Sequence, residues 1–364
     1  MSDQASSKHA NFIIRSQEPL NGGPPLPALA ATAMTPNDLF FVRNHGSIPQ
    51  IDPAVFRLEI GGMVQRPLTL ALADLRGLPR ASVAATLQCA GNRRDELSAV
   101  APTPGELPWG AEAISSAVWE GVPLREILRA AGIDTGATHV AFTSSDDVER
   151  SGRHFGFGGS LPLAKALAPE VLLADTMNGA PLPAEHGFPL RVVAPGYIGA
   201  RSVKWLQTIT LQAEPSDNYF QAHAYKLFPT DITAQNVDWQ GGMMLGEQSL
   251  TSVICDPATG AKLAAGPVLL RGYAYAGGER LVERVEVSAD GGACWQQAEL
   301  LGQPERWAWR LWQARIDVPP GRHTLAVRAW DSAAQTQPSE ICQVWNFKGY
   351  MNNAWHRIAV EAVE

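Results

Sequence analysis

The residue pattern of this 364-residue chain changes near residue 234, and this change constrains the fold more than any other feature. Before it, strand-like segments such as 55–60 and 139–143 alternate with a helical segment opened by Pro123, whose apolar residues share one face. After it, alternating segments such as 285–288 and 325–329 are separated by turns, without a helical period. This pattern predicts an α+β fold, in which a mixed α+β domain is followed by an all-β, immunoglobulin-like sandwich.

The change in residue pattern, together with a proline-rich stretch near the N-terminus, divides the chain into three regions. We expect an extended N-terminal lead-in over residues 1–30, a mixed domain over 31–234 and a sandwich over 235–364. The stretch 22–27 (GGPPLP) is typical of stiff, unstructured chain. Seven of the eleven tryptophans lie from Trp295 onward, which favours an aromatic-rich core for the sandwich.

Charge and cysteine content exclude several classes of protein. With 29 basic and 36 acidic residues the net charge is −7, so a nucleic-acid or anionic-membrane surface is not expected. The four cysteines are far apart and form no C-x-x-C pair, so neither a disulfide framework nor a zinc site is indicated. No segment has the properties of a signal peptide or a membrane span, so we expect a cytoplasmic protein, or a periplasmic one if an export signal was removed.

Cys89 stands at the end of a short strand, in the segment LQCAGNRR (87–94). Two following arginines would favour the thiolate, which is the form that binds soft metals or attacks electrophiles. For this cysteine alone, a buried structural role is the commoner alternative.

Two further segments concentrate donors for an anion. Arg43 follows two phenylalanines in FFVRNHG (40–46), where it could hold an oxyanion, although an exposed turn is the alternative. Arg191, Arg201 and Lys204 flank a loop with two glycines, an arrangement typical of a phosphate cradle but also of a plain turn. These residues alone do not identify a reaction.

Six segments in order, FFVRNHG, LQCAGNRR, HGFPLRVV, PGYIGARSVKWL, WAWRLW and MNNAWHR, together resemble the molybdenum-cofactor sulfite oxidase family. The lead-in SQEPLNGGPP is most similar to the plant-type, haem-free members and their bacterial relatives. Because little chain precedes the first motif, no haem domain is expected.

The resemblance implies a molybdenum-molybdopterin cofactor without haem, with Cys89 as the metal ligand. It implies a substrate pocket of Arg43, Arg94, Trp109, Tyr225 and Lys348. The cofactor-binding positions that it implies, besides Cys89, are Phe41, Val42, Arg43, Asn44, His45, Asp146, His186, Arg191, Ser202, Val203 and Lys204.

The implied reaction is the oxidation of sulfite to sulfate by oxygen-atom transfer at an oxo-molybdenum centre. Dioxygen or a separate cytochrome would accept the electrons, and a homodimer is expected. Two positions depart from the family pattern. Lys348 stands where an arginine is expected, and a lysine lacks the bidentate fork of an arginine. Pro104 stands near a position where some relatives carry a lysine.

Two alternatives remain. One is an oxidoreductase of the same superfamily that acts on another oxyanion, such as nitrate, although Tyr225 stands where a nitrate reductase would carry an amide residue. The other is a non-catalytic binding protein that kept the fold, which would leave Cys89, Arg43 and Arg94 without a use.

Overall fold

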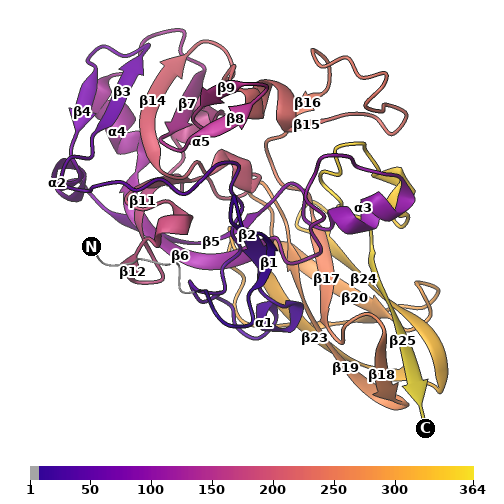
Figure 1. Cartoon of the computed structure of the whole chain (residues 1–364). Coiled ribbons are helices and arrows are strands. Elements are labelled where there is room, and N and C mark those ends of the chain that lie inside the picture. Colours follow the sequence, from indigo (N-terminus) through magenta and orange to yellow (C-terminus); the bar gives the residue numbers. More distant parts are fainter. Residues whose placement is uncertain (1–7) are drawn as a thin grey trace.

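A computed structural model describes residues 8–364, so residues 1–7 of the expected lead-in lie outside the described range. The molecule has a wide α+β part and a narrower all-β part, and the C-terminus lies at the tip of the latter (Figure 1). No helix within residues 8–364 is long and apolar enough to cross a membrane.

Two sheets form the α+β domain. The first has the order β10 (Gly158–Pro162), β7 (His139–Ser144), β14 (Leu206–Gln212), β3 (Leu58–Gly62) and β4 (Leu68–Leu70). The second has the order β12 (Ala180–Pro181), β11 (Leu172–Met177), β6 (Ile114–Pro123) and β5 (Ala81–Gln88), with β13 (Arg191–Val193) also paired to β11. The expected strand at 55–60 begins only at Leu58, because Val55 lies in a turn and is 70% exposed.

Helix α4 (Leu124–Ala131) confirms the amphipathic segment predicted after Pro123. Its apolar face is buried at Leu124, Ile127, Leu128 and Ala131, and it ends at Gly132, whose φ of 71° suits glycine. The other helices are short: α2 (Leu72–Arg76), α3 (Arg94–Val100) and α5 (Leu163–Ala166). Side chains of α4, β3, β7, β11 and β14 together form the main aliphatic core of this domain.

The C-terminal part is a sandwich of two sheets, as predicted. One has the order β17 (Thr251–Asp256), β19 (Gly266–Tyr275), β23 (Arg310–Val318) and β22 (Glu299–Leu300). The other has the order β18 (Ala261–Ala264), β25 (His356–Val363), β24 (Gly321–Asp331), β20 (Val282–Ser288) and β21 (Gln296–Gln297). The alternating residues Leu325, Val327 and Ala329 are fully buried between them.

The expectation of an aromatic-rich sandwich core is wrong. That core consists of valine, leucine, isoleucine and alanine, with Trp312 as its single aromatic side chain among the described residues. Trp307 and Trp309 instead pack toward the α+β domain. Trp295, Trp330 and Trp355 are half-buried at the surface, where Arg328 lies over all three rings. Alternation along a strand shows which residues share a face of the sheet, but not whether that face packs on the second sheet or on the neighbouring domain.

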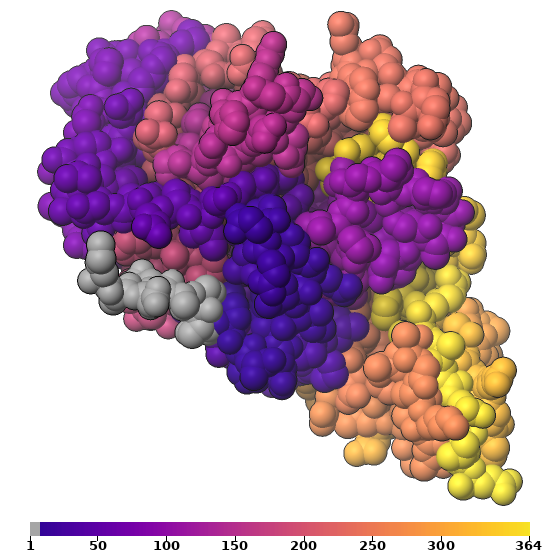
Figure 2. All heavy atoms as spheres, viewed as in Figure 1, coloured from indigo at the N-terminus to yellow at the C-terminus, as the bar shows by residue number. Residues whose placement is uncertain are grey.

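The lead-in is folded rather than extended over the part that the structure describes. Strands β1 (Ile13–Ser16) and β2 (Asn21–Gly23) form a hairpin, and α1 (Leu26–Leu29) is a single turn. Leu29 is fully buried and packs against side chains of β17, β19 and β6. Apolar residues within the proline-rich stretch therefore anchor this segment across the junction of the two domains, where the indigo chain lies in Figure 2.

Two further hairpins are small: β8 (Val148–Arg150) with β9 (Arg153–Phe155), and β15 (Lys226–Leu227) with β16 (Met243–Met244). Four short helical turns complete the described structure: η1 (Ala184–His186), η2 (Gly199–Arg201), η3 (Phe220–Ala224) and η4 (Ile341–Gln343). The boundary that we place at residues 234/235 falls in the loop between β15 and β16. Between the domains, the Tyr273 hydroxyl donates to the Ala111 carbonyl at 2.9 Å and the Trp309 amide to Thr86 Oγ1 at 2.9 Å. The two domains therefore share a polar and aromatic contact surface.

Candidate active site

A pocket that is partly open to solvent lies where β5 ends and the loops after α1, β7, β12 and β13 meet. Most of the predicted site residues line it: Phe41, Arg43, Asn44, His45, Cys89, Asp146, His186, Arg191, Ser202, Lys204 and Tyr225. Segments that lie far apart in the chain thus converge on one cavity.

Cys89 is held by the turn that follows β5. Its amide donates to the Ala113 carbonyl at 2.9 Å, and its Sγ accepts the Gly91 amide at 3.4 Å. The side chain is buried but lines the pocket. Within residues 8–364 no group of three or more His, Cys, Asp and Glu side chains could hold a metal ion. A metal at Cys89 would therefore need other ligands from a cofactor.

Arg43, His45 and Tyr225 form a chain of hydrogen bonds on one wall. Arg43 Nη2 lies 3.2 Å from His45 Nδ1, and His45 Nε2 lies 2.9 Å from the Tyr225 hydroxyl oxygen. Because arginine can only donate, Nδ1 accepts and the Nε2 hydrogen is donated to Tyr225. Burial and Arg43 hold the pKa of His45 well below its usual value, which agrees with a neutral ring. The Tyr225 hydroxyl hydrogen then remains available to a ligand in the pocket.

Arg191 and Lys204 bring further positive charge to the pocket. Arg191 donates to the carbonyls of His186 at 2.9 Å, Ser202 at 3.0 Å and Val192 at 3.3 Å, and burial lowers its pKa to about 9. Burial and Arg191 also lower the pKa of Lys204. These cations favour an anionic group in the pocket, because an anion would offset the cost of burying them.

Asp146, Ser202 and Asn44 add polar groups to the pocket lining. Asp146 Oδ1 accepts the Phe157 amide at 2.8 Å, and burial raises the pKa of this carboxyl. Ser202 Oγ accepts the Ala194 amide at 3.0 Å. Asn44 Nδ2 is buried without a hydrogen-bond partner, so it could donate to a bound molecule.

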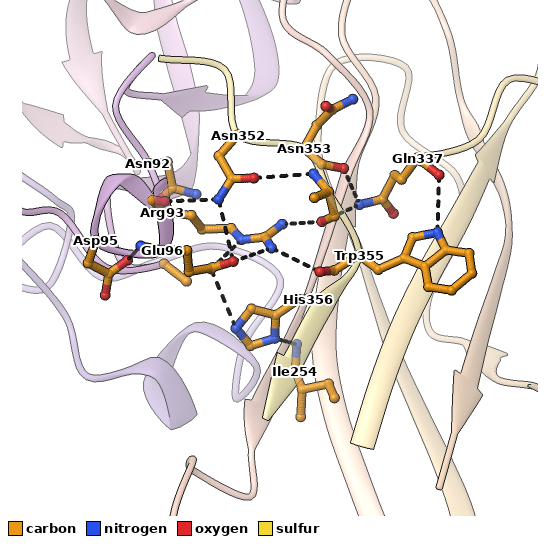
Figure 3. Close-up of polar contacts among 12 residues, drawn as sticks. Asn92, Arg93, Asp95, Glu96, Ile254, Gln337, Asn352, Asn353, Trp355 and His356 are labelled. Atoms are coloured by element: carbon orange, nitrogen blue, oxygen red, sulfur yellow. Dashed lines mark hydrogen bonds and ion pairs between the residues drawn. The ribbon is translucent and has the colours of Figure 1, made fainter. Parts of the chain in front are cut away.

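The two arginines after Cys89 point in different directions, contrary to the expectation that both lie beside the thiol. Arg93 pairs with Glu96 at 2.7 Å and donates to the Ala354 carbonyl at 2.8 Å, while Asn352 Nδ2 donates to the Arg93 carbonyl at 2.9 Å (Figure 3). The C-terminal segment thereby fixes the turn that carries Cys89. Arg94 instead lies against Gly91, where a Cβ would overlap its guanidinium.

Five predicted residues do not line the pocket. Val42 exchanges backbone hydrogen bonds with Gly22, and the Val203 carbonyl accepts a hydrogen bond from the Val192 amide. Both residues therefore position neighbouring backbone segments through their own main chain. Trp109 is fully buried in an apolar cluster, and its Nε1 has no partner. Arg94 and Lys348 lie beside the pocket and pair with Glu106.

Other residues at the site were not predicted. Phe40, Leu87, Ala90, Ser144, Phe157, Gly199, Ala200 and Trp205 also line the pocket. Several of them lie within the segments that resemble the family, and this position in a motif is the signal that could have identified them. Lys8 reaches His186 Nε2 at 2.9 Å and Glu185 at 3.0 Å from the lead-in, and no sequence signal identified Lys8 or Glu106.

Comparison with known proteins adds to this geometry. The family model "Oxidoreductase molybdopterin binding domain" matches residues 45–220, and "Mo-co oxidoreductase dimerisation domain" matches residues 243–363. The sulfite oxidase of Arabidopsis thaliana is 40% identical, over 98% of this chain and 95% of that protein. The chain belongs to the sulfite oxidase family of molybdenum oxidoreductases.

Other family members are similarly related. The sulfite oxidase of Gallus gallus is 42% identical, over 96% of this chain and 78% of that protein. The mitochondrial sulfite oxidase of Homo sapiens is 42% identical over 97% of this chain, which spans 66% of that relative's length. Among solved structures, the sulfane dehydrogenase SoxCD from Paracoccus pantotrophus matches with a TM-score of 0.81 and 26% identity, over 96% of this chain and 88% of that chain.

The pocket fits the cofactor of this family. Cys89 offers one soft ligand, which suits a metal whose remaining ligands come from a dithiolene. The guanidinium of Arg191 donates to carbonyl oxygens and lies over the Trp119 ring, and none of these partners is charged, so a phosphate would provide the opposite charge that this buried group lacks. The unpaired Asn44 Nδ2 gives a further donor for a polar cofactor.

Proposed function

We propose that this chain oxidises sulfite to sulfate with a molybdenum-molybdopterin cofactor. Sulfite and water give sulfate, two protons and two electrons, and the electrons pass to an acceptor. The observation that carries the proposal is the convergence of Cys89 with the cations Arg43, Arg191 and Lys204 on one pocket. The bound cofactor would supply the oxygen-atom transfer and the redox chemistry.

In this proposal the chain's own residues divide the work between cofactor and substrate. Cys89 ligates the metal, and Arg191 and Lys204 neutralise the cofactor phosphate. Arg43 and Tyr225 face the substrate, where the free hydroxyl hydrogen of Tyr225 would donate to an oxyanion oxygen. Burial raises the pKa of Tyr225 above its usual value, which keeps that hydrogen in place at neutral pH.

A metal and activity assay tests the proposal. After expression in a host that makes the cofactor, we expect about one molybdenum per chain and sulfite-dependent reduction of ferricyanide. Below about a tenth of a molybdenum per chain, the binding-protein alternative would be favoured. Full metal content with turnover of nitrate but not of sulfite would favour the nitrate reductase-like alternative. A nitrate reductase of Hordeum vulgare is 36% identical to this chain, over 99% of this chain and 43% of that protein.

The electron acceptor is proposed to be dioxygen or a separate cytochrome. Dioxygen consumption and cytochrome reduction, measured with the same sulfite concentration, distinguish the two. We also propose that the chain carries no haem, which the visible spectrum of the purified protein tests. The proposed compartment is the cytoplasm, with the periplasm as the alternative, and cell fractionation distinguishes them.

We propose a homodimer formed through the C-terminal domain. The match to a dimerisation domain supports this, as do the half-buried tryptophans around Arg328, which lies 4.0 Å from the centre of the Trp295 ring. Light scattering should report about 78 kDa, twice the 39.1 kDa of one chain. A particle of one chain's mass at micromolar concentration would contradict the dimer.

A further inference from the structure

Glu106 lies between two cations beside the pocket. Its Oε1 forms a short ion pair with Lys348 Nζ, and its Oε2 lies 3.7 Å from Arg94 Nη2. Arg94 is buried, whereas the Glu106 and Lys348 side chains are 13% and 15% exposed, so the pair reaches solvent. One carboxylate therefore occupies the space that an external anion would take between these cations.

This cluster adjoins the substrate side of the pocket. The Tyr225 ring, which lines the pocket, stacks on the Tyr350 ring with their centres 5.3 Å apart. Arg94 lies over the same Tyr350 ring at 5.1 Å, and Lys348 Nζ lies 5.7 Å from its centre. The two tyrosines thus connect Glu106 and its cations directly to the pocket wall.

Two of the three guanidinium nitrogens of Arg94 already donate to backbone carbonyls. Nη1 donates to the Leu107 carbonyl at 2.7 Å, and Nε to the carbonyls of Gly349 at 3.1 Å and Lys348 at 3.2 Å. Gly91 and Gly349 both pack so closely on this side chain that neither position leaves room for a Cβ. The group that remains for an anion is Nη2, and Glu106 faces it.

We propose that Glu106 is a specificity-determining residue whose carboxylate occupies the anion site between Arg94 and Lys348 and competes with the substrate oxyanion. This inference rests on the proposed oxidation of sulfite. Sulfite must displace the carboxylate from Arg94 and Lys348, or bind beside it against the repulsion of like charges. Lys348 supports the exchange, because a flexible ammonium can turn from the carboxylate to the substrate.

The substitution Glu106→Gln tests the proposal in the molybdenum-loaded protein. Glutamine keeps the size of the side chain and an acceptor for Lys348 but removes the competing charge. We expect KM for sulfite and the dissociation constant of sulfate, measured by calorimetry, each to fall about fivefold, which corresponds to the loss of one partly screened charge interaction. A residue with only a structural role would not lower both constants.

Two further variants complete the experiment. Glu106→Asp is too short to span both cations, so we expect KM between those of the parent and of Glu106→Gln. The matched control is Glu170→Gln, because Glu170 pairs with Lys165 at 2.5 Å at similar exposure but lies outside the pocket lining. This control should leave KM and sulfate binding within about twofold of the parent.

The outcomes separate the inference from the proposed function. If the parent protein oxidises sulfite but both Glu106 variants show an unchanged or higher KM and weaker sulfate binding, the inference is wrong and the function stands. If the loaded parent does not oxidise sulfite, the proposed function fails first. If Glu106→Gln does not fold, Glu106→Asp tests the inference alone: a KM below that of the parent supports it, and an unchanged or higher KM contradicts it.

Discussion

Single residues at this site owe their chemistry to burial without a matching charge. Arg191 donates to three carbonyl oxygens, and its lowered pKa follows from burial alone. Burial and, after it, the surrounding cations hold the pKa of His45 well below its usual value, and Arg43 then determines which nitrogen of the neutral ring carries the hydrogen. These hydrogen-bond partners are close in the sequence, but the rings that pack on the two groups, Trp119 on Arg191 and Phe157 on His45, come from distant segments.

The substitution Cys89→Ser should abolish the proposed metal ligation. A serine hydroxyl is a harder donor and stays protonated at neutral pH, so we expect sulfite oxidation to fall roughly 100-fold or more. X-ray absorption should show one sulfur ligand fewer at the metal, which is a readout independent of activity. The control Cys294→Ser changes an exposed cysteine outside the pocket lining and should keep the parent rate. Parent-like turnover by Cys89→Ser would refute the assignment.

At the scale of elements, the turn between β5 and α3 determines where the cations lie. The amides of Asn92 and Arg94 donate to the carbonyls of Cys89 and Gly91, and Arg93 adopts a left-handed φ of 63°. This conformation directs consecutive arginines to opposite sides, so that Arg93 reaches the sandwich while Arg94 packs over Gly91. The motif alone does not reveal this division, because both arginines have the same chemistry.

Gly91→Ala should displace Arg94, since its Cβ would overlap the guanidinium. With the cation moved away from Glu106 and Tyr350, we expect KM for sulfite to rise about tenfold, the equivalent of one charged hydrogen bond. Steady-state kinetics at varied sulfite concentration measures this. The control Gly61→Ala, in β3, has no atom within 4 Å of its Cβ and should leave KM unchanged. An unaltered KM in Gly91→Ala would mean that Arg94 does not contribute to substrate binding.

At the scale of the whole molecule, a buried polar cluster joins the two domains. Glu96 pairs with Arg93 at 2.7 Å and lies 4.0 Å from His356, whose Nδ1 accepts the Ile254 amide at 3.2 Å (Figure 3). Helix α3 and the C-terminal segment are thereby held together, as the contact of purple and yellow atoms in Figure 2 also shows. The geometry of the active site therefore depends on the docking of the sandwich.

His356 should make the protein less stable in mild acid. Burial lowers its pKa to about 4, so between pH 6.5 and 4 the unfolded chain binds a proton that the folded chain does not. The free energy of unfolding then decreases as the pH falls through this window, by at most about 1.4 kcal/mol per pH unit. Asp95 acts in the opposite sense, because its pKa is raised to about 6, mainly by burial.

Urea unfolding at pH 7 and pH 5 measures the effect. The variant His356→Asn keeps an acceptor for the Ile254 amide. In this variant the decrease in the free energy of unfolding from pH 7 to pH 5 should be smaller than in the parent. The exposed His9 provides the control, and His9→Gln should behave as the parent. An identical pH dependence in His356→Asn and the parent would contradict the lowered pKa of His356.

Much of this organisation could be predicted from the sequence alone. The period of apolar residues identified α4 and the strands of the sandwich, since local geometry repeats within a few residues. The quoted motifs identified most pocket residues and the family. Local patterns failed where position depends on distant contacts, as in the folded lead-in and the tryptophans that lie outside the sandwich core.

The distribution of charge around the site depends on the tertiary structure. The order of residues along the chain is sufficient to show that Arg43, Arg94 and Lys348 are cations, that Cys89 directly follows a strand and that the chain has two domains. It did not reveal that Glu106 lies between two of those cations, because Glu106 and Lys348 are 242 residues apart and meet only when the domains pack together. Electrostatic interactions depend on distance and burial in space, which separation along the chain does not specify.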